Sequence, residues 1–419
     1  MNFADHYYSK HSLYPALIKE NTSCNLFLSI VIPCHNEPDL LISLNSLWQC
    51  DRPKCDVEVI VVINAAIDAN QSVIDANIDT LEKTNNWILN HQDSKLRFYV
   101  LYFDNFNSKD AGVGLARKIG MDEAARRLIS IDKHRGVITG FDADSICERN
   151  YLVEVENYFQ NHPKINASSI YFEHPLTGDN YGSLIYGGII QYELYLRFYM
   201  QSLRWAGHPY SFHTVGSSFA VRADVYMKQG GMNKRKAGED FYFLQKVIPL
   251  ENYGELNTTK VIPSPRPSDR VPFGTGATIQ KMITLSSSEL TTYNFDAFVD
   301  LKLFFSRFDE LYRITQIYYL EFLDKLPNPI KLFCEETNFW GEIELANQNT
   351  ADLNSFKSRL FKAFNAFKVL KYLNYSHEHW YKQLPIVESA YSYLKTTGVC
   401  ETEDISAESL LLIYRKLER

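Results

Sequence analysis

Four short apolar segments, separated by helical patterns, constrain the fold of this chain more than any other feature. Each is apolar at nearly every position and rich in β-branched or aromatic residues, as strands buried on both faces are. The segments span residues 26–33, 57–63, 96–103 and 136–141. Helical patterns follow the first segment at 39–48 and precede the fourth at 114–131. Buried strands joined by helices predict a mainly parallel α/β sheet with flanking helices and right-handed crossovers.

The pattern changes after about residue 285. Helical, aromatic-rich segments at 300–324, 353–373 and 406–417 replace the strand patterns. The segment 264–276 is dense in Pro and Gly, which is typical of a connecting loop. We therefore expect an α/β domain over residues 1–285 and a helical C-terminal extension over residues 286–419.

Composition excludes several classes of function. With 45% hydrophobic and 14% aromatic residues, the 419-residue chain has the apolar surface that a folded protein needs. Its 43 basic and 50 acidic residues give a net charge of -7, the wrong sign for a surface that follows nucleic acid, so no nucleic-acid partner is expected. We find no secretory signal pattern and no run of about 20 apolar residues that could cross a bilayer. Seven dispersed cysteines without C-x-x-C pairs favour reduced thiols and a cytoplasmic location.

Two acids follow the fourth predicted strand, where a parallel sheet binds its ligands. Asp142 and Asp144 are separated by one residue and both can face a cleft there. Paired carboxylates form a hard oxygen site suited to Mg²⁺ or Mn²⁺, and such an ion can hold a diphosphate. Alternatively, Asp144 and Ser145 cap a helix that starts near Glu148, because Asp and Ser are favoured N-caps.

A second pair of acids, Glu239 and Asp240, precedes a helical segment at 241–247. One of them can act as a general base that takes a proton from a hydroxyl nucleophile. Alternatively, both acids simply favour the positive end of the helix dipole. A basic triplet at 234–236 stands just before them and fits either a solvated loop or a lid over a diphosphate.

Taken together, the motifs resemble family 2 glycosyltransferases of the GT-A fold over roughly residues 26 to 280. The resemblance is carried by LSIVIPCHNE at 28–37, DVEVIVVIN at 56–64, GVGLARKIGMDEA at 112–124, GFDADS at 140–145, GSSFAVRADVYMKQGGM at 216–232 and GEDFYFL at 238–244. It implies a Rossmann-like, mainly parallel sheet. No single motif is specific, but their order and spacing are.

The resemblance implies a nucleotide pocket. Pro33, Asn36 and Glu37 match the family's P-x-x-N-E, and this loop, with His35, would line the base. Asn64 stands where the family usually has an acid that contacts the base, so the contact is made without a charge.

The resemblance also implies roles near the diphosphate. Arg117 matches the arginine of A-R-N and would lie near the base or diphosphate, while Lys118 replaces the following Asn. Asp144 would be the direct metal ligand and Asp142 would share the metal or lie nearer the ribose. The loop at 264–276 offers Arg266 and Arg270, of which Arg270 is the candidate diphosphate contact; a surface arginine is the alternative.

The reaction implied is transfer from a nucleotide-diphosphate sugar to an acceptor hydroxyl, with Asp240 as base and Glu239 beside it in the acceptor pocket. The resemblance favours inversion, a Mn²⁺ or Mg²⁺ cofactor, and a UDP-sugar donor, with a GDP-sugar left open. No Q-x-x-R-W follows Asp240, which favours single addition in glycan or surface polysaccharide biosynthesis. The acceptor would be a glycan or a lipid-linked molecule.

Two alternatives stay open. The chain could be a non-catalytic GT-A-like protein that binds a nucleotide or glycan, because a fold does not guarantee activity. A sugar-phosphate nucleotidyltransferase is disfavoured, because it needs a Gly-rich, Arg-containing loop where this chain has Pro33 to Glu37. The basic amphipathic stretch at 353–373 fits either peripheral contact with the inner face of a membrane or packing against the protein itself.

Overall fold

The structure is a computed structural model that describes residues 3–268, 274–285, 289–399 and 405–419. The chain forms two compact units. The sheet unit comprises Met1–Gly178, Thr214–Ala277 and Arg419, and the helical unit comprises Asp179–His213 and Thr278–Glu418. This division places helix α6 (Ser183–Trp205) in the helical unit, whereas the prediction assigned those residues to the N-terminal domain.

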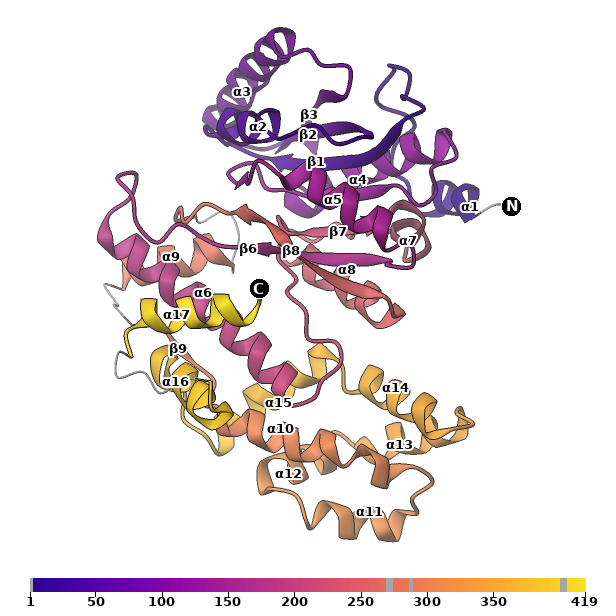
Figure 1. Ribbon diagram of the computed structural model, residues 1–419, viewed down its shortest axis with the longest axis vertical. Coiled ribbons are helices and arrows are strands. Elements are labelled where there is room, and N and C mark those ends of the chain that lie inside the picture. Colours follow the sequence, from indigo (N-terminus) through magenta and orange to yellow (C-terminus); the bar gives the residue numbers. More distant parts are fainter. Residues whose placement is uncertain (1–2, 269–273, 286–288, 400–404) are drawn as a thin grey trace. The chain divides into compact units, whose positions relative to one another are not determined.

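The described part of the sheet unit contains an eight-stranded mixed sheet with the strand order β3-β2-β1-β4-β7-β6-β8-β5 (Figure 1). The strands are β1 (Leu26–Cys34), β2 (Asp56–Ala66), β3 (Leu96–Phe106), β4 (Val137–Gly140), β5 (Ile146–Cys147), β6 (Ala167–Phe172), β7 (Phe219–Arg222) and β8 (Tyr253–Ile262). β3, β2, β1 and β4 are parallel, and β7 runs antiparallel to β4 and β6. The predicted α/β class with a C-terminal helical region is confirmed.

Helices cover both faces of the sheet, as Figure 1 shows. They are α2 (Leu40–Trp48), α3 (Gln71–Asn90), α4 (Val113–Ser130), α5 (Tyr151–Asn161), α7 (Ala223–Lys228) and α8 (Glu239–Val247), with α1 (Phe3–Lys10) before them and a 3₁₀ turn at Ile248–Leu250. Leu28 and Ile30 of β1 share one core with Leu44 of α2, while Val31 faces Gly120 of α4 on the other side. Burial on both faces explains why β1 reads as a continuous apolar run.

Strand ends differ slightly from the predicted ones. β1 continues through Cys34, so Pro33 is buried inside the strand. Pairing of β1 with β4 ends at Val31. Pro33, which has no N–H group to donate, therefore leaves no gap in the hydrogen bonds between these two strands. β2 continues to Ala66, which places Asn64 inside the strand.

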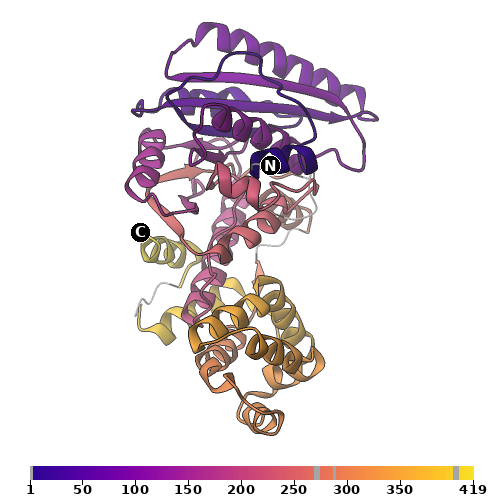
Figure 2. The same cartoon turned by 90° about the vertical axis from the view of Figure 1, so that its right-hand side faces the viewer.

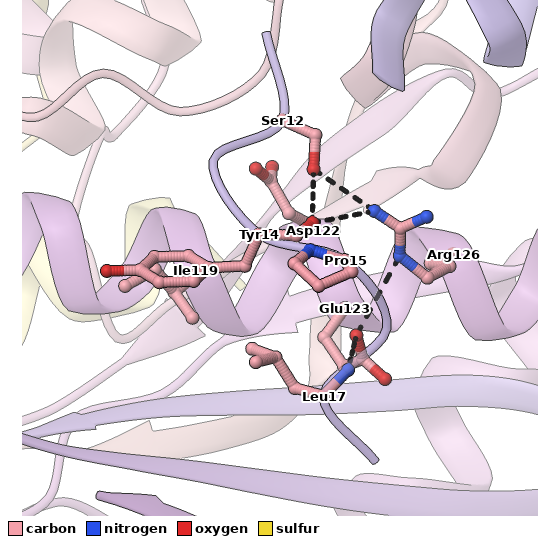
Figure 3. Close-up of a pocket in the computed structure, with 8 residues that line it drawn as sticks. All are labelled: Ser12, Tyr14, Pro15, Leu17, Ile119, Asp122, Glu123 and Arg126. Carbon is pink, nitrogen blue, oxygen red and sulfur yellow. Dashed lines mark hydrogen bonds and ion pairs between the residues drawn. The ribbon is translucent and has the colours of Figure 1, made fainter. Parts of the chain in front are cut away.

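The N-terminal segment packs along α4 and explains why that helix buries many charged residues. Tyr7 donates to Asp122 (2.6 Å), and the backbone N–H groups of Leu17 and Ile18 donate to Glu123 (3.1 Å each). A small pocket lies there, lined by Ser12, Tyr14, Pro15, Leu17, Ile119, Asp122, Glu123 and Arg126 (Figure 3). None of the predicted site residues lines this pocket.

The helical unit has an aromatic core. Its helices are α6, α10 (Asp296–Ser306), α11 (Gln316–Leu323), α12 (Asn328–Glu336), α13 (Phe339–Gln348), α14 (Leu353–Ala363), α15 (Ala366–His379), α16 (Ile386–Thr397) and α17 (Ala407–Leu417) (Figures 1 and 2). A 3₁₀ turn at Phe308–Leu311 and the short pair β9 (Thr291–Thr292) and β10 (Leu384–Pro385) also belong to it, and α9 (Thr275–Thr284) crosses the boundary between the units. Phe308 is central, with ring centroids 5.0 Å from Phe304 and 4.8 Å from Phe361.

The basic stretch at 353–373 forms two helices rather than one. Asn365 ends the first by capping α15, since its side chain accepts from the N–H groups of Phe367 and Lys368. The apolar residues Phe356, Leu360 and Phe364 are fully buried in the helical unit. The apolar face of this stretch is therefore used in packing. In the described parts of the chain, no helix is long and apolar enough to cross a membrane.

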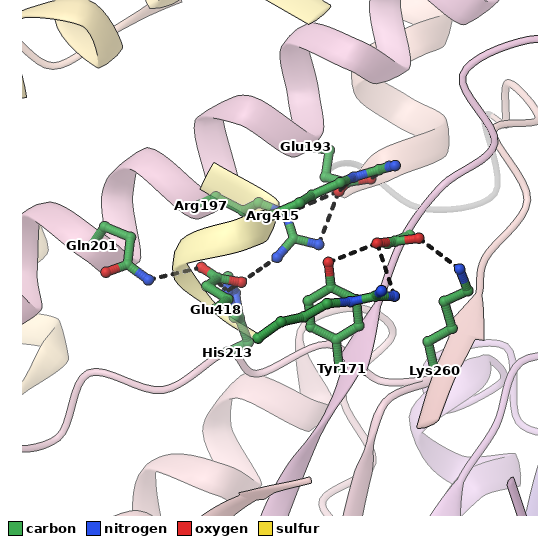
Figure 4. A network of polar contacts seen from close by, with 10 residues as sticks. Tyr171, Glu193, Arg197, Gln201, His213, Lys260, Arg415 and Glu418 are labelled. Carbon is green, nitrogen blue, oxygen red and sulfur yellow. Dashed lines mark hydrogen bonds and ion pairs between the residues drawn. The ribbon is translucent and has the colours of Figure 1, made fainter. Parts of the chain in front are cut away.

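A buried ionic network joins α6 to the C-terminal end of α17 within the helical unit (Figure 4). Glu193 accepts from Arg197 (2.9 Å) and Arg415 (2.7 Å), and Glu418 bonds Arg197 and His213. Burial opposes the charge of Glu418, but His213 and Arg197 outweigh it and lower the pKa of Glu418 to about 2. Each buried charge thus has a partner, as low dielectric surroundings require.

Candidate active site

Arg117 of α4 brings the two acidic motifs together at the end of β4. Its guanidinium donates to Asp142 Oδ1 (2.8 Å), to Glu239 Oε1 (3.0 Å) and to the carbonyl of Gly216 (2.6 Å). The Arg117 side chain is 2% exposed, so these bonds form in low dielectric surroundings. Burial opposes its charge, but Asp142, Glu239 and Asp240 outweigh burial and raise the pKa of Arg117, which stays charged.

Asp240 lies beside this arginine because residue 216 is glycine. A Cβ atom at position 216 would lie 2.8 Å from Asp240 Oδ2 and 2.9 Å from Arg117 Nη2. Only hydrogen at that position leaves room for both groups. The other oxygen, Asp240 Oδ1, accepts from the N–H of Phe241 (2.7 Å), so Oδ2 faces Arg117 and Gly216.

The local backbone places both acids at a helix N-terminus. Gly238 has φ +68°, a left-handed conformation that favours glycine, and α8 begins at Glu239, two residues before the predicted start. Both acids thus stand in the first turn, where the helix dipole favours negative charge. The dipole interpretation and the base interpretation of this pair are compatible.

Burial and neighbouring charges raise the pKa values of Glu239 and Asp240. Burial and the Glu239 charge raise the pKa of Asp240 to about 7, although Arg117 opposes the shift. Burial also raises the pKa of Glu239, again against Arg117. A carboxyl group with a pKa near neutrality can hold and release a proton at physiological pH, which is what general acid–base chemistry needs.

A second arginine, Arg266, gathers three more acids. It makes a two-pronged pair with Glu37, in which Nη1 donates to Oε1 at 2.8 Å, and it also contacts Asp39 (3.2 Å) and Asp144 (3.4 Å). The hydrogen bonds that Arg266 donates to Glu37 raise the pKa of Arg266 against the effect of burial. Arg270, the predicted diphosphate contact, lies outside the described residues.

A cluster of hydrogen-bonded polar groups lies where β1 and β2 end. Asn64 donates from Nδ2 to the carbonyl of Cys34 (2.9 Å), and its own carbonyl contacts His35 Nδ1 (2.8 Å) and Asn77 Nδ2 (3.0 Å). Asn77 in turn accepts from the N–H of Asn36 (2.8 Å). The buried Oδ1 of Asn64 has no hydrogen-bond partner among the described residues. A buried acceptor of this kind suits a ligand that donates an N–H group.

The structure therefore brings most of the predicted residues into three groups within the sheet unit. Arg117 gathers Asp142, Glu239 and Asp240; Arg266 gathers Glu37 and Asp144; and Asn64 lies with His35. Pro33 lies inside β1, and in the sequence it comes before His35 and Glu37.

Three contributors were not among the predicted site residues. Arg266 was the arginine passed over in favour of Arg270, Gly216 was not singled out as a contact, and Asn77 was missed. Asn77 is fully buried in α3, and a polar residue on the buried face of a helix was the available signal.

Asp142 and Asp144 retain the chemistry of a hard-cation site. Their side chains are 37% and 24% exposed, and each bonds a different arginine. In the described part of the chain, no group of three or more His, Cys, Asp or Glu side chains is arranged to hold a metal ion. Mg²⁺-type ions are commonly held by one or two carboxylates plus substrate phosphates and water, so these two acids fit such an ion when a diphosphate supplies the remaining oxygens.

No family model matches the sequence, and no curated protein matches it. Among solved structures, residues 1–349 of S. aureus TarS match with a TM-score of 0.40 and 14% identity over 85% of this chain and 93% of that chain. A complex of the same TarS fragment with UDP-GlcNAc gives 0.39 and 15% over 94% and 90%. The Pyrobaculum calidifontis mannosyltransferase PcManGT, with GDP-Man and Mn²⁺, gives 0.36 and 13% over 99% and 92%. At scores this low the likeness carries no conclusion about function.

Proposed function

We propose that this chain is a GT-A-type glycosyltransferase of family 2 that moves a sugar from a nucleotide diphosphate to an acceptor hydroxyl with inversion. The observation that carries the proposal is the Arg117 cluster, in which Asp240 has a pKa of about 7 beside Asp142 and Glu239. A base whose pKa matches the working pH combines a useful ionised fraction with useful proton affinity.

In the reaction, Asp240 Oδ2 takes the proton of the acceptor hydroxyl, since Oδ1 is held by the N–H of Phe241. The acceptor oxygen forms a bond to the anomeric carbon while the bond from that carbon to the diphosphate oxygen breaks. The electron pair leaves with the diphosphate, and the proton stays on Asp240. Arg117 keeps Asp142 and Glu239 in place around this base.

The polar groups around Asn64 support nucleotide-base binding, because they lie at the carboxyl ends of β1 and β2, where a parallel sheet binds its ligands. A UDP-sugar remains the favoured donor and a GDP-sugar the second choice. His35 and Glu37 belong to the same loop, which continues β1.

Asp144, with Asp142, would hold a Mn²⁺ or Mg²⁺ ion together with the donor diphosphate. Such an ion, when bound, offsets the negative charge that develops on the leaving diphosphate. Arg266, already beside Asp144, is placed to contribute a further positive charge there. A glycan or lipid-linked acceptor and single addition complete the proposal.

Binding and transfer are best measured separately. We would record thermal shifts with UDP, GDP, CDP and dTDP, each with and without Mn²⁺, and then nucleotide release from the matching sugars. Asp240→Asn should bind the nucleotide within a few fold of wild type and lose transfer. Asp144→Ala should lose the manganese-dependent part of binding. Asp132→Asn, at a side chain 98% exposed, is the matched control and should change neither.

Each outcome decides something. If Asp240→Asn is as active as wild type, Asp240 is not the base. Nucleotide binding without transfer from any donor would favour the non-catalytic alternative. A folded wild-type protein that no nucleotide stabilises, with or without Mn²⁺, would overturn the proposal.

A further inference from the structure

Two cysteine thiols face each other next to the segment that carries Asp142 and Asp144. Cys50 lies just after α2, Cys147 belongs to β5, and their sulfurs are 3.6 Å apart. Cys50 Sγ is also within 3.4 Å of the carbonyl of Ser46 and 3.5 Å of that of Glu148. Both cysteines are free, and both belong to the sheet unit.

We propose that Cys50 and Cys147 are a site of reversible oxidation, at which a hydroperoxide converts the two thiols to a disulfide. A disulfide has an S–S distance of about 2.05 Å, so the sulfurs must approach by about 1.5 Å to form one. This inference goes beyond the proposed function and does not depend on it, because its chemistry involves neither donor nor acceptor.

The surroundings make Cys50 the reacting sulfur. The hydrogen bond from the Cys147 thiol lowers the pKa of Cys50, although burial opposes this effect. Burial and the same hydrogen bond raise the pKa of Cys147 well above its ordinary value. The lowered pKa favours Cys50 as the sulfur that reacts first, because the thiolate is the nucleophilic form, and Cys147 is then the resolving thiol.

The chemistry balances with hydrogen peroxide as the oxidant. The Cys50 thiolate attacks one peroxide oxygen, the O–O bond breaks, and Cys50 becomes a sulfenic acid as hydroxide leaves. The Cys147 sulfur then attacks the Cys50 sulfur and displaces water. In sum, two thiols give up two electrons and two protons, and one peroxide becomes two waters. Cys50 is only 3% exposed, so an oxidant close to water in size is the class that fits.

The disulfide would tie the segment just after α2 to β5, which directly follows the loop that carries Asp142 and Asp144. Ser43 of α2 already donates to the carbonyl of Ala143 (2.8 Å), between the two acids, and Ser46 Oγ lies 3.8 Å from Cys147 Sγ. A covalent bond between Cys50 and Cys147 would add a second attachment between the α2 segment and residues 143–147, beside the hydrogen bond from Ser43 to Ala143. Oxidation should therefore restrict the motion of the Asp142–Asp144 segment.

The test is peptide mapping of the full chain after exposure to hydrogen peroxide. Wild type should give a Cys50–Cys147 crosslinked peptide two hydrogens lighter than the reduced pair, and dithiothreitol should restore both thiols. Cys147→Ser should stop at a Cys50 sulfenic acid that dimedone traps once the protein is unfolded, whereas Cys50→Ser should leave Cys147 reduced. Cys55→Ser, which removes another buried thiol, is the matched control and should crosslink like wild type.

Two results would overturn the proposal. One is the recovery of Cys50 and Cys147 as free thiols at peroxide doses that oxidise the exposed Cys24. The other is a crosslink that joins Cys50 to a different cysteine or to a second molecule.

Discussion

Replacing Asp240 with asparagine should remove transfer and at the same time stabilise the protein above neutral pH. The pKa of Asp240 is raised from 3.8 to about 7 by burial and by the Glu239 charge. The folded state therefore holds the Asp240 proton more tightly than the unfolded state does. This contribution to stability is fully present below about pH 4 and is lost as pH rises through about 7.

The size of the effect follows from the shift. The pKa of Asp240 rises by about three units, and each unit corresponds to about 1.4 kcal/mol. At high pH, ionised Asp240 therefore destabilises the folded state by at most about 4 kcal/mol. Partial exposure of the side chain and local relaxation reduce this, so we expect a gain of about 1–3 kcal/mol for Asp240→Asn at about pH 8. At about pH 4 wild-type Asp240 is itself neutral, so the substitution should change the free energy of unfolding little.

Urea unfolding at the two pH values measures this difference directly. Asn keeps the bond that Asp240 Oδ1 accepts from the N–H of Phe241, so the variant should fold. Asp132→Asn, at an exposed acid, should show no comparable pH-dependent gain. Equal stability changes at both pH values, or a loss at about pH 8, would refute the raised pKa and with it the electrostatic reason for choosing Asp240 as base.

Three further outcomes follow from the same geometry. Glu239→Gln should move the acid limb of the pH–activity profile down by about one unit, because the Glu239 charge raises the pKa of Asp240; a full profile with an unmoved limb would contradict this coupling. Gly216→Ala should cut kcat by about tenfold or more, because its methyl group would lie 2.8 Å from Asp240 Oδ2, and unchanged kinetics would disprove the close approach. Asn365→Ala should lower the free energy of unfolding by about 1 kcal/mol through loss of the α15 cap, measurable by urea titration; an unchanged midpoint would argue against the cap.

The first half of the sheet was predictable because β1, β2 and β4 are buried on both faces and read as unbroken apolar runs, whereas β3 is mostly half-buried but rich in aromatic residues. The later strands gave no such signal. β8 has the sequence YGELNTTKVI with several half-buried positions, and β5 is two residues long. The helical region was recognised, but its breaks were not, since they depend on single caps such as Asn365.

The composition of the candidate site was predictable in part, but its grouping was not. The acids were found because they stand next to strand and helix ends. Which arginine each acid meets depends on contacts across 122 residues for Asp144 with Arg266 and 25 for Asp142 with Arg117, and spacing in the sequence does not encode such contacts. The role of Gly216 likewise appears only when the neighbouring groups are placed.

Arg117 gives a physical reason, independent of motif, why Asp240 rather than a neighbouring acid suits the base role. Among the described contacts, Arg117 donates to Asp142 and Glu239 but not to Asp240. A carboxylate bonded to a guanidinium is stabilised in its ionised form and accepts a proton poorly. Asp240 feels the charge of Arg117 without that bond, and burial together with Glu239 outweighs the attraction. Arg117 thus bonds two of the acids directly, and Asp240, which lacks that bond, has a pKa of about 7.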